Sequence, residues 1–449
     1  MRHLKEYHSK SEYEADYHSG KLPFPHVCAV NGKAVYAKSY QAEKKNDIPM
    51  YIEALEDTSV SFTTNQIQYS LDNETWVDLP ANTNAPAISA GGKMYFRAEG
   101  LSPTSSAGIG TFKINGKCNV GGNIMSLLYG DDFADAVYIE KIYSFYRLFY
   151  QQTAIVDAGS LVLPATTLAN YCYQYMFQNC SSLVNAPELP AMSLASACYS
   201  NMFNGCTSLV NAPELPAMSL ASSCYAYMFN GCTSLINAPK LPALAMESYC
   251  YSYMFSYCTS LVNAPALPAT TMQAECYRNM FQYCSNLVNA PELPALTLSS
   301  NCYSYMFQYC TSLVNAPELP ATTLTGSCYQ YMFNGCTSLV NAPKILPATT
   351  LANYCYQYMF QNCSSLVNAP ELPAMSLASS CYNYMFQYCS SLQYIKAMFT
   401  TTPSSPYLSS WVNGVKSVGT FVKNAAATWT DTFGLSAIPT GWTVELAEA

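Results

Sequence analysis

A unit of 26 residues, repeated nine times, governs residues 172 to 397 of this chain. The unit reads C-Y-x-[YN]-M-F-x-x-C-[ST]-[SN]-L-[VI]-N-A-P-x-L-P-A, followed by a variable linker, and its two cysteines stand eight positions apart. The step is 26 residues, or 27 where Ile345 is inserted. A unit this short cannot bury its own apolar face, whereas stacked units share one continuous core. The repeat therefore predicts a solenoid.

Each unit divides into two limbs. The first, C-Y-x-x-M-F, places large side chains at i, i+1, i+4 and i+5, and this spacing predicts one or two helical turns with one apolar face. The second, L-V-N-A-P-E-L-P at 183–190, has two prolines, which favour extended backbone and remove ladder donors. We therefore expect an α/β solenoid of about ten units whose strands are short and irregular.

Stacking places equivalent residues in columns about 4.8 Å apart along the strand side. We expect structural ladders in the columns that begin at Cys172, Phe177, Cys180, Leu183 and Asn185, the last as a ladder of side-chain amides. Cysteine in such a column serves as a small hydrophobe, so reduced, buried thiols are favoured over the alternative of structural disulfides.

The ends of the array differ from its middle. Residues 141–171 are a degraded capping repeat, in which Ser144 and Gln152 replace the two cysteines, and residues 172–402 hold the nine full repeats. Because a unit without cysteines is tolerated, an essential metal or disulfide is disfavoured. Residues 403–449 are predicted to form a C-terminal cap over the last open strand edge. This segment carries three tryptophans, Trp411, Trp429 and Trp442.

Two further regions precede the array. Residues 1–46 are predicted to be an attachment arm, with a hairpin through Asn31-Gly32. Residues 47–140 contain short strand-like runs separated by turn residues, and this pattern predicts a small β-sandwich. Gly121-Gly122 is interpreted as one of the turns. The strand-like runs lie at 50–52, 60–62, 67–69, 94–97 and 111–114.

The composition excludes several classes of function. Only 11% of residues are charged, and a net charge of −8 with 20 Lys and Arg offers no surface for phosphate neutralisation, so nucleic acid is excluded as a partner. No run of about 18 apolar residues exists to span a membrane. No histidine follows His26, and the cysteine spacing is not that of zinc sites, so we expect no catalytic residue, metal or cofactor.

Ligand-contact positions are expected where residues vary while their neighbours stay fixed. The residue after C-Y varies from Gln174 to Ser200, Ala226, Ser252 and Arg278, which suggests a surface column. Tyrosine offers flat, amphipathic contact area suited to glycans or proteins. Candidate contacts are the tyrosines that Asn or Gly replaces in other units, and the acidic residue between Pro and Leu: Tyr257, Tyr283, Tyr309, Tyr388, Glu188, Glu214, Glu292 and Glu318.

The combination of period, Y-x-Y-M-F limb, F-x-x-C-[ST]-S-L junction and L-P turn resembles the BspA-like class of leucine-rich repeats. The proline in N-A-P-x-L-P departs from that class, in which the strand limb is a continuous β-forming run. The flanks resemble repeat proteins of gut Bacteroidetes and their phages, through S-P-T-S-S-x-G-I-G-T-F at 102–112, G-T-F-V-K at 419–423 and I-P-x-G-W-T-V at 438–444.

The resemblance of the flanks implies a non-enzymatic virion protein, such as a fibre or adhesion protein. The arm would bind other virion proteins, and the array would present a recognition surface to a host glycan or protein, with a homo-oligomer possible. The charged N-terminus does not read as a signal peptide, which favours a virion over the alternative, a bacterial cell-surface adhesin. An intracellular scaffold for protein partners and a stiff spacer without a ligand are further alternatives.

Overall fold

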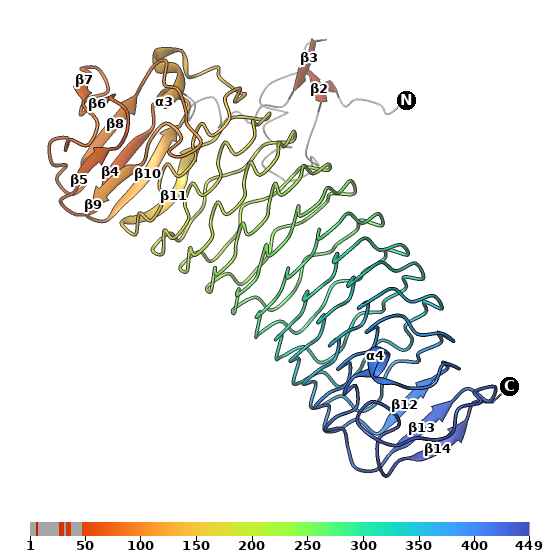
Figure 1. The fold of residues 1–449 in the computed structure, drawn as a ribbon. Coiled ribbons are helices and arrows are strands. Elements are labelled where there is room, and N and C mark those ends of the chain that lie inside the picture. Colours follow the sequence, from red (N-terminus) through yellow and green to blue (C-terminus); the bar gives the residue numbers. More distant parts are fainter. Residues whose placement is uncertain (1–5, 8–26, 31–32, 37–46, 449) are drawn as a thin grey trace.

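The computed structural model describes residues 6–7, 27–30, 33–36 and 47–448. From residue 47 onwards the molecule is elongated (Figure 1): a β-sheet region lies at one end, a stack of coils forms the middle, and a three-stranded sheet lies at the other end. Each coil in the stack is one repeat unit. A single hydrophobic core extends from Met50 to Trp442, so the three parts share their buried side chains.

The N-terminal part contains three sheets. Within the arm, β1 (Glu6–Tyr7), β2 (Val27–Val30) and β3 (Lys33–Tyr36) form one sheet in that order, and the antiparallel pairing of β2 with β3 confirms the predicted hairpin. A six-stranded sheet has the order β11-β10-β4-β8-β6-β7, and β5 pairs with β9. The strands and short helices from residue 51 to 162 are β4 (Tyr51–Ala54), β5 (Ser59–Phe62), β6 (Ile67–Ser70), β7 (Val77–Leu79), β8 (Lys93–Arg97), β9 (Phe112–Asn115), β10 (Cys118–Asn123), α3 (Ser126–Tyr129), the 3₁₀ turn η1 (Gly130–Asp132) and β11 (Ile155–Val162).

The larger sheet joins this part directly to the stack of coils. Its edge strand β11 belongs to the predicted capping repeat and pairs in parallel with β10. The ring of Phe112 contacts Phe62, Phe96 and Phe149, with centroids 4.8, 4.9 and 5.5 Å away, so one aromatic cluster spans both sheets and the first coil. The predicted strand runs are confirmed, and the sandwich arrangement remains a prediction. The turn expected at Gly121-Gly122 is wrong, because both glycines lie in β10, where the Tyr51 ring leaves no room for a Cβ at Gly121.

The helical limb predicted for each repeat is also wrong. Residues 170–179 form consecutive turns, and every fourth residue has a positive φ: Tyr171 at 59°, Tyr175 at 60° and Asn179 at 60°. Successive backbone amides alternate between an acceptor in the same coil and one in the next coil. Met176 donates to the Tyr173 carbonyl three residues earlier, and Phe177 donates to the Met202 carbonyl of the next coil. An α-helix would bond every amide within the segment. We call this segment and its equivalents the turn limb.

The second limb is extended but forms almost no regular strand, as the prolines predict. In the full coils, isolated parallel bridges connect neighbouring units at asparagines such as Asn185, Asn211 and Asn237, and a second set connects residues such as Thr271 and Thr297. Regular strands form only where N-A-P-x-L-P is missing, in β11 at one end and in β12 (Tyr394–Ala397) at the other. The loss of a ladder donor at proline explains the difference. We call residues 183–193 and their equivalents the extended limb.

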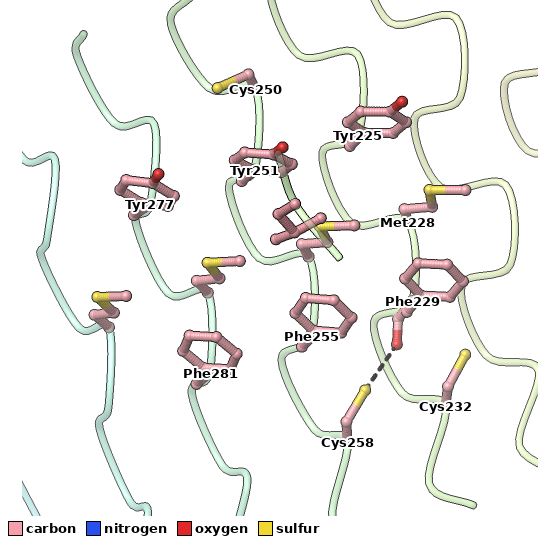
Figure 2. Close-up of a cluster of buried hydrophobic side chains, with 14 of the residues drawn as sticks. Tyr225, Met228, Phe229, Cys232, Cys250, Tyr251, Phe255, Cys258, Tyr277 and Phe281 are labelled. Carbon is pink, nitrogen blue, oxygen red and sulfur yellow. Dashed lines mark hydrogen bonds between the residues drawn. The ribbon is translucent and has the colours of Figure 1, made fainter. Parts of the chain in front are cut away.

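The core of the stack consists of straight columns of identical side chains (Figure 2). Rings of Tyr225 and Tyr251 stack with centroids 5.8 Å apart, and rings of Phe229 and Phe255 with centroids 5.7 Å apart. Leu183 and its equivalents are fully buried in every coil, as are both cysteine columns. The predicted columns at Cys172, Phe177, Cys180 and Leu183 are therefore confirmed as core.

The C-terminal segment continues the stack with irregular coils. Tyr382 and Phe386 of the last full repeat donate their amides to Tyr407 and Trp411, so α4 (Ser405–Leu408) and the residues after it occupy the next coil position. The buried Trp411 ring contacts the Phe386 ring at 5.9 Å. Strands β12, β13 (Thr420–Lys423) and β14 (Thr443–Leu446) form a parallel sheet in that order. The segment thus covers the last full repeat by extending the stack.

Candidate functional site

The four tyrosines predicted as ligand contacts occupy a positive-φ position of the turn limb. Tyr257, Tyr283, Tyr309 and Tyr388 have φ values of 59° to 62°, and Asn179 and Gly205 hold the same position in other coils. Asparagine and glycine tolerate this conformation best, so their alternation with tyrosine reflects backbone geometry as well as surface exposure.

The structure brings three of these tyrosines together. Tyr283 stacks on Tyr257 and on Tyr309, with centroids 4.6 and 4.8 Å apart, which forms a continuous row that we call the tyrosine row. The row ends at Gly335, where a Cβ would lie 2.4 Å from the Tyr309 ring. Tyr388 lies three coils farther along and is 51% exposed. The tyrosine row is therefore an ordered aromatic strip, and Tyr388 is separate from it.

The predicted acidic contacts lie on the other limb. Glu188, Glu214, Glu292 and Glu318 are all exposed, as expected, and each projects from the extended limb nine residues after the tyrosine-row position. The extended-limb bridge at Asn185 and its equivalents comes between the two positions in every coil. The tyrosines and the glutamates are therefore placed on different segments of the coil and do not form one cluster.

The column after C-Y is not a surface column throughout, which corrects the sequence-based expectation. Ser200, Ala226 and Ser252 are 3–5% exposed, because they form the floor of a groove rather than a convex surface. The residues that line this groove extend from the first coil, with Gln174, to the fifth, with Arg278. The groove, which we call the turn-limb groove, has a volume of about 470 Å³.

Two positive-φ columns form the walls of the turn-limb groove. The first wall is the residue before C-Y: Tyr171, Ala197, Ser223, Tyr249 and Glu275. The second wall is the position three residues after the first cysteine: Tyr175, Asn201, Tyr227 and Tyr253. Tyr227 and Tyr253 stack face to face with centroids 4.4 Å apart, so the second wall contains an ordered pair of rings over two coils. Sequence variation at the floor marked this place, but only the geometry of the turns reveals a concave site.

One charged pair lies inside the groove. The guanidinium Nη1 of Arg278 donates to Glu275 Oε2 at 2.7 Å, and the Tyr249 hydroxyl donates to Glu275 Oε1 at 3.1 Å. The Arg278 guanidinium carbon also lies 5.8 Å from the centroid of the Tyr305 ring. Partial burial lowers the pKa of Arg278, but the hydrogen bond to Glu275 and its negative charge outweigh this effect, and the pKa is raised above its ordinary value. The groove chemistry is thus hydroxyls, tyrosine rings and one ion pair.

The two cysteine columns differ in their hydrogen bonds. The second cysteine of each repeat donates its thiol to the phenylalanine carbonyl of the preceding coil at 3.0–3.2 Å, as Cys258 does to Phe229 (Figure 2). First-column cysteines such as Cys224 have no such acceptor. The 19 cysteines whose side chains are described are free and buried. Burial raises the pKa of the Cys180 and Cys198 thiols to about 12, so both columns are inert at neutral pH.

Side-chain amides stack in two places. In the predicted column, Asn289 donates to Asn263 and Asn341 to Asn315, so the ladder forms only in separate pairs, and all its asparagines are exposed. A continuous ladder that the sequence analysis did not predict follows the residue two positions before the second cysteine. It runs through Gln282, Gln308, Asn334, Gln361 and Gln387.

The described residues contain neither a metal-binding cluster nor a membrane-spanning helix. Within residues 47–448 and the described strands of the arm, no three His, Cys, Asp or Glu side chains lie close enough to hold a metal ion. In the same part of the chain no helix combines the length and apolarity needed to cross a bilayer. The four histidines, His3, His8, His18 and His26, lie outside the described residues.

Stacked coils, straight side-chain columns and bridged extended limbs together define a leucine-rich repeat protein. A family model described as BspA type leucine-rich repeat region (6 copies) matches residues 160–314 and 300–408, which together span more than half of the chain. The chain therefore belongs to the BspA-type leucine-rich repeat family. No curated protein matches the chain. A solved leucine-rich repeat protein from Bacteroides ovatus ATCC 8483 is similar at 14% identity over 75% of this chain and 96% of its own, with a TM-score of 0.29.

Proposed function

We propose that this chain is a non-enzymatic recognition protein that holds its ligand on the turn limb of the array. The observation that carries the proposal is the turn-limb groove, where a polar floor lies between tyrosine-bearing walls. Tyrosine supplies large contact area with little loss of side-chain entropy, and it is enriched in recognition surfaces. The tyrosine row at Tyr257, Tyr283 and Tyr309 continues the same limb beyond the groove.

The stiffness of the array supports this role. Each coil is tied to the next by alternate backbone amides of the turn limb and by stacked rings in the core. A ligand therefore meets walls that are already in place, and binding costs little ordering of the protein. A site of this kind serves adhesion or protein binding without any catalytic group.

The setting we propose is a phage virion, in which residues 1–46 bind other virion proteins and the array meets a glycan or protein of the host surface. This part of the proposal rests on the resemblance of the flanking sequences to repeat proteins of gut Bacteroidetes and their phages. A homo-oligomer is compatible with it. The rival is a bacterial cell-surface adhesin of the same repeat family, and an intracellular scaffold for protein partners is a weaker rival.

The test measures binding of the labelled full chain to a panel of gut Bacteroidetes cells. We expect Ala226→Arg, which fills the middle of the groove, to abolish binding. Replacement of Tyr257, Tyr283 and Tyr309 by Ser should weaken it. The matched control replaces the exposed glutamates of the extended limb, Glu188, Glu214, Glu292 and Glu318, by Gln, and should leave binding unchanged. The proposal fails if the groove variant binds as well as the original chain or if the glutamate control loses binding.

A second measurement separates the settings. Gold-labelled antibody against the array is viewed by electron microscopy on purified phage particles and on cells. Label at a defined site on particles supports the virion setting, whereas label on cell envelopes alone supports the adhesin.

A further inference from the structure

The repeat is interrupted at one place on the extended limb, where Ile345 is inserted between Lys344 and Leu346. The backbone around the insertion pairs with the next coil. Glu371 donates its amide to the Lys344 carbonyl at 3.1 Å, and Leu346 donates to the Glu371 carbonyl at 3.0 Å. Lys344 and Glu371, each of which follows a proline, are thereby fixed side by side on neighbouring coils.

A hollow of about 470 Å³ lies at this insertion, and we call it the insertion hollow. Its polar and aromatic lining residues are Asn341, Lys344, Asn368, Glu371 and Tyr394. The two asparagines and the lysine are exposed, and the other two residues are half-buried, so solvent reaches all five. Tyr394 takes the position that asparagine holds in the preceding coils, and it bridges to Asn368. Two departures from the repeat, the insertion and the tyrosine, thus meet at one hollow.

The insertion hollow contains a cation without a counter-ion. Lys344 forms no ion pair with any carboxylate of the described residues. Its neighbour Glu371 pairs instead with Lys396, with 3.3 Å between Oε2 and Nζ. Two lysines therefore surround one carboxylate here, although the chain as a whole carries a net charge of −8. An anionic group in the hollow gains the attraction of Lys344 without displacing an existing partner.

The side-chain amides near Lys344 add hydrogen-bonding groups of both kinds. Asn341 donates its amide to Asn315 at 2.7 Å, which leaves its carbonyl oxygen as an acceptor for a ligand. The side chain of Asn368 has no hydrogen-bond partner among the described residues, so it can both donate and accept. Tyr394 adds amphipathic contact area. A sugar that bears a carboxylate matches this set, because its hydroxyl groups need donors and acceptors and its carboxylate needs a cation.

We propose that the insertion hollow binds an acidic sugar, a hexuronate unit, with its carboxylate on the Lys344 ammonium and its hydroxyl groups on Asn341 and Asn368. This inference goes beyond the proposed function, because the hollow lies on the extended limb and is lined by none of the residues of the turn-limb groove. The acidic sugar is a ligand of its own, distinct from the cell-surface partner of the groove.

The experiment uses the full chain and three small probes. Methyl glucuronide carries the sugar and the carboxylate, methyl glucoside carries the sugar alone, and acetyl-glutamate amide carries a carboxylate without a sugar. Saturation-transfer NMR with a concentration series gives the affinity for each probe. We expect the glucuronide to bind at least about tenfold more tightly than either of the others, since it alone combines a charge-assisted hydrogen bond with the amide contacts. Equal binding of the glucoside or of the glutamate probe would overturn the assignment to an acidic sugar.

The variants test the place of binding. Lys344→Gln should weaken glucuronide binding at least about tenfold. The matched control is Lys240→Gln, because Lys240 holds the same position in a coil that has no insertion and lies outside the hollow, and it should leave binding unchanged. Deletion of Ile345 restores the 26-residue step, and Tyr394→Asn restores the repeated residue without a change of coil length; each should weaken binding. Circular dichroism checks that every variant is folded. Binding that survives Lys344→Gln, or that Lys240→Gln weakens equally, would overturn the inference.

This proposal and the proposed function fail separately. Ala226→Arg, which fills the turn-limb groove, should leave glucuronide binding unchanged. If Ala226→Arg abolishes binding to cells and the original chain does not bind the glucuronide, the recognition role stands and the inference on the insertion hollow is wrong. If Lys344→Gln loses glucuronide binding while Ala226→Arg still binds cells, the hollow is a sugar site and the groove is not the recognition site.

Discussion

Alkaline pH is expected to unfold this protein abruptly, because its core contains two columns of nine thiols. All 18 repeat cysteines are buried, and burial raises the pKa of every one. For Cys180 the pKa rises from 9.0 to about 12. The unfolded chain therefore releases thiol protons at lower pH than the folded chain, and the free energy of unfolding falls as pH rises above about 9.

The magnitude follows from the number of thiols. At pH 10 an exposed thiol of pKa 9.0 gains about 1.4 kcal/mol by ionising, and a thiol held at about 12 gains almost nothing. Over 18 such thiols the loss of stability is on the order of 25 kcal/mol. Even half of that value is comparable to the whole stability of an ordinary domain, roughly 5–15 kcal/mol. The stacked, buried tyrosines act in the same direction.

The assay follows thiolate absorbance and the near-ultraviolet circular dichroism of the tyrosines between pH 7 and 11. We expect both signals to change together in one steep transition between about pH 9 and 10. Replacing four first-column cysteines by Ala serves as the control, since the pH dependence of the unfolding free energy should then fall in proportion to the thiols removed. Thiols that ionise near pH 9 while the tyrosine signal persists would refute the reasoning.

Three further predictions follow from the coil geometry. Denaturation should raise the number of thiols that react with a thiol reagent at pH 7.5 by 19, since the 19 described cysteines are free and buried; a much smaller rise would indicate disulfides. Cys224→Ser should destabilise the chain by about 1–3 kcal/mol more than Cys232→Ser in urea unfolding, because only the latter retains an acceptor, the carbonyl of Phe203; equal losses would contradict the role of the thiol hydrogen bond. Gly335→Ala should lower the free energy of unfolding more than Gly231→Ala, although both glycines have φ near 74°, because only Gly335 lies against a tyrosine ring. Urea unfolding measures both losses, and equal losses would contradict the stacking of Tyr309 on this glycine.

Much of the fold follows from residues that repeat. The column of Leu183 and the aromatic columns could be predicted because a fixed period must stack identical side chains. The prolines of N-A-P-x-L-P correctly indicated an irregular strand, and the chain provides its own comparison, since β11 and β12 form where those prolines are missing. The side-chain columns and the irregular strand could be predicted because each depends only on one repeat unit and the copy stacked on it.

The turn limb could not be predicted from the apolar spacing. Large residues at i, i+1, i+4 and i+5 fit a helix of 3.6 residues per turn and a chain of four-residue turns equally well over so short a segment. The distinguishing signal was the alternation of Asn179 with Gly205 and Gly231, since both residue types favour positive φ. The groove escaped prediction for the same reason, because Ser200 and Ser252 become a concave floor only when the turns raise a wall on each side.

We propose that the turn limb, not the extended limb, contacts the ligand. The most direct measurement places a photo-crosslinking amino acid at Tyr227 on the groove wall or at Met218 on the extended limb, where Met218 is 50% exposed. The labelled full chain is then irradiated on cells that bind it. We expect adducts from the Tyr227 position and none from the Met218 position. Adducts from Met218 alone would contradict it and move the recognition surface to the extended limb.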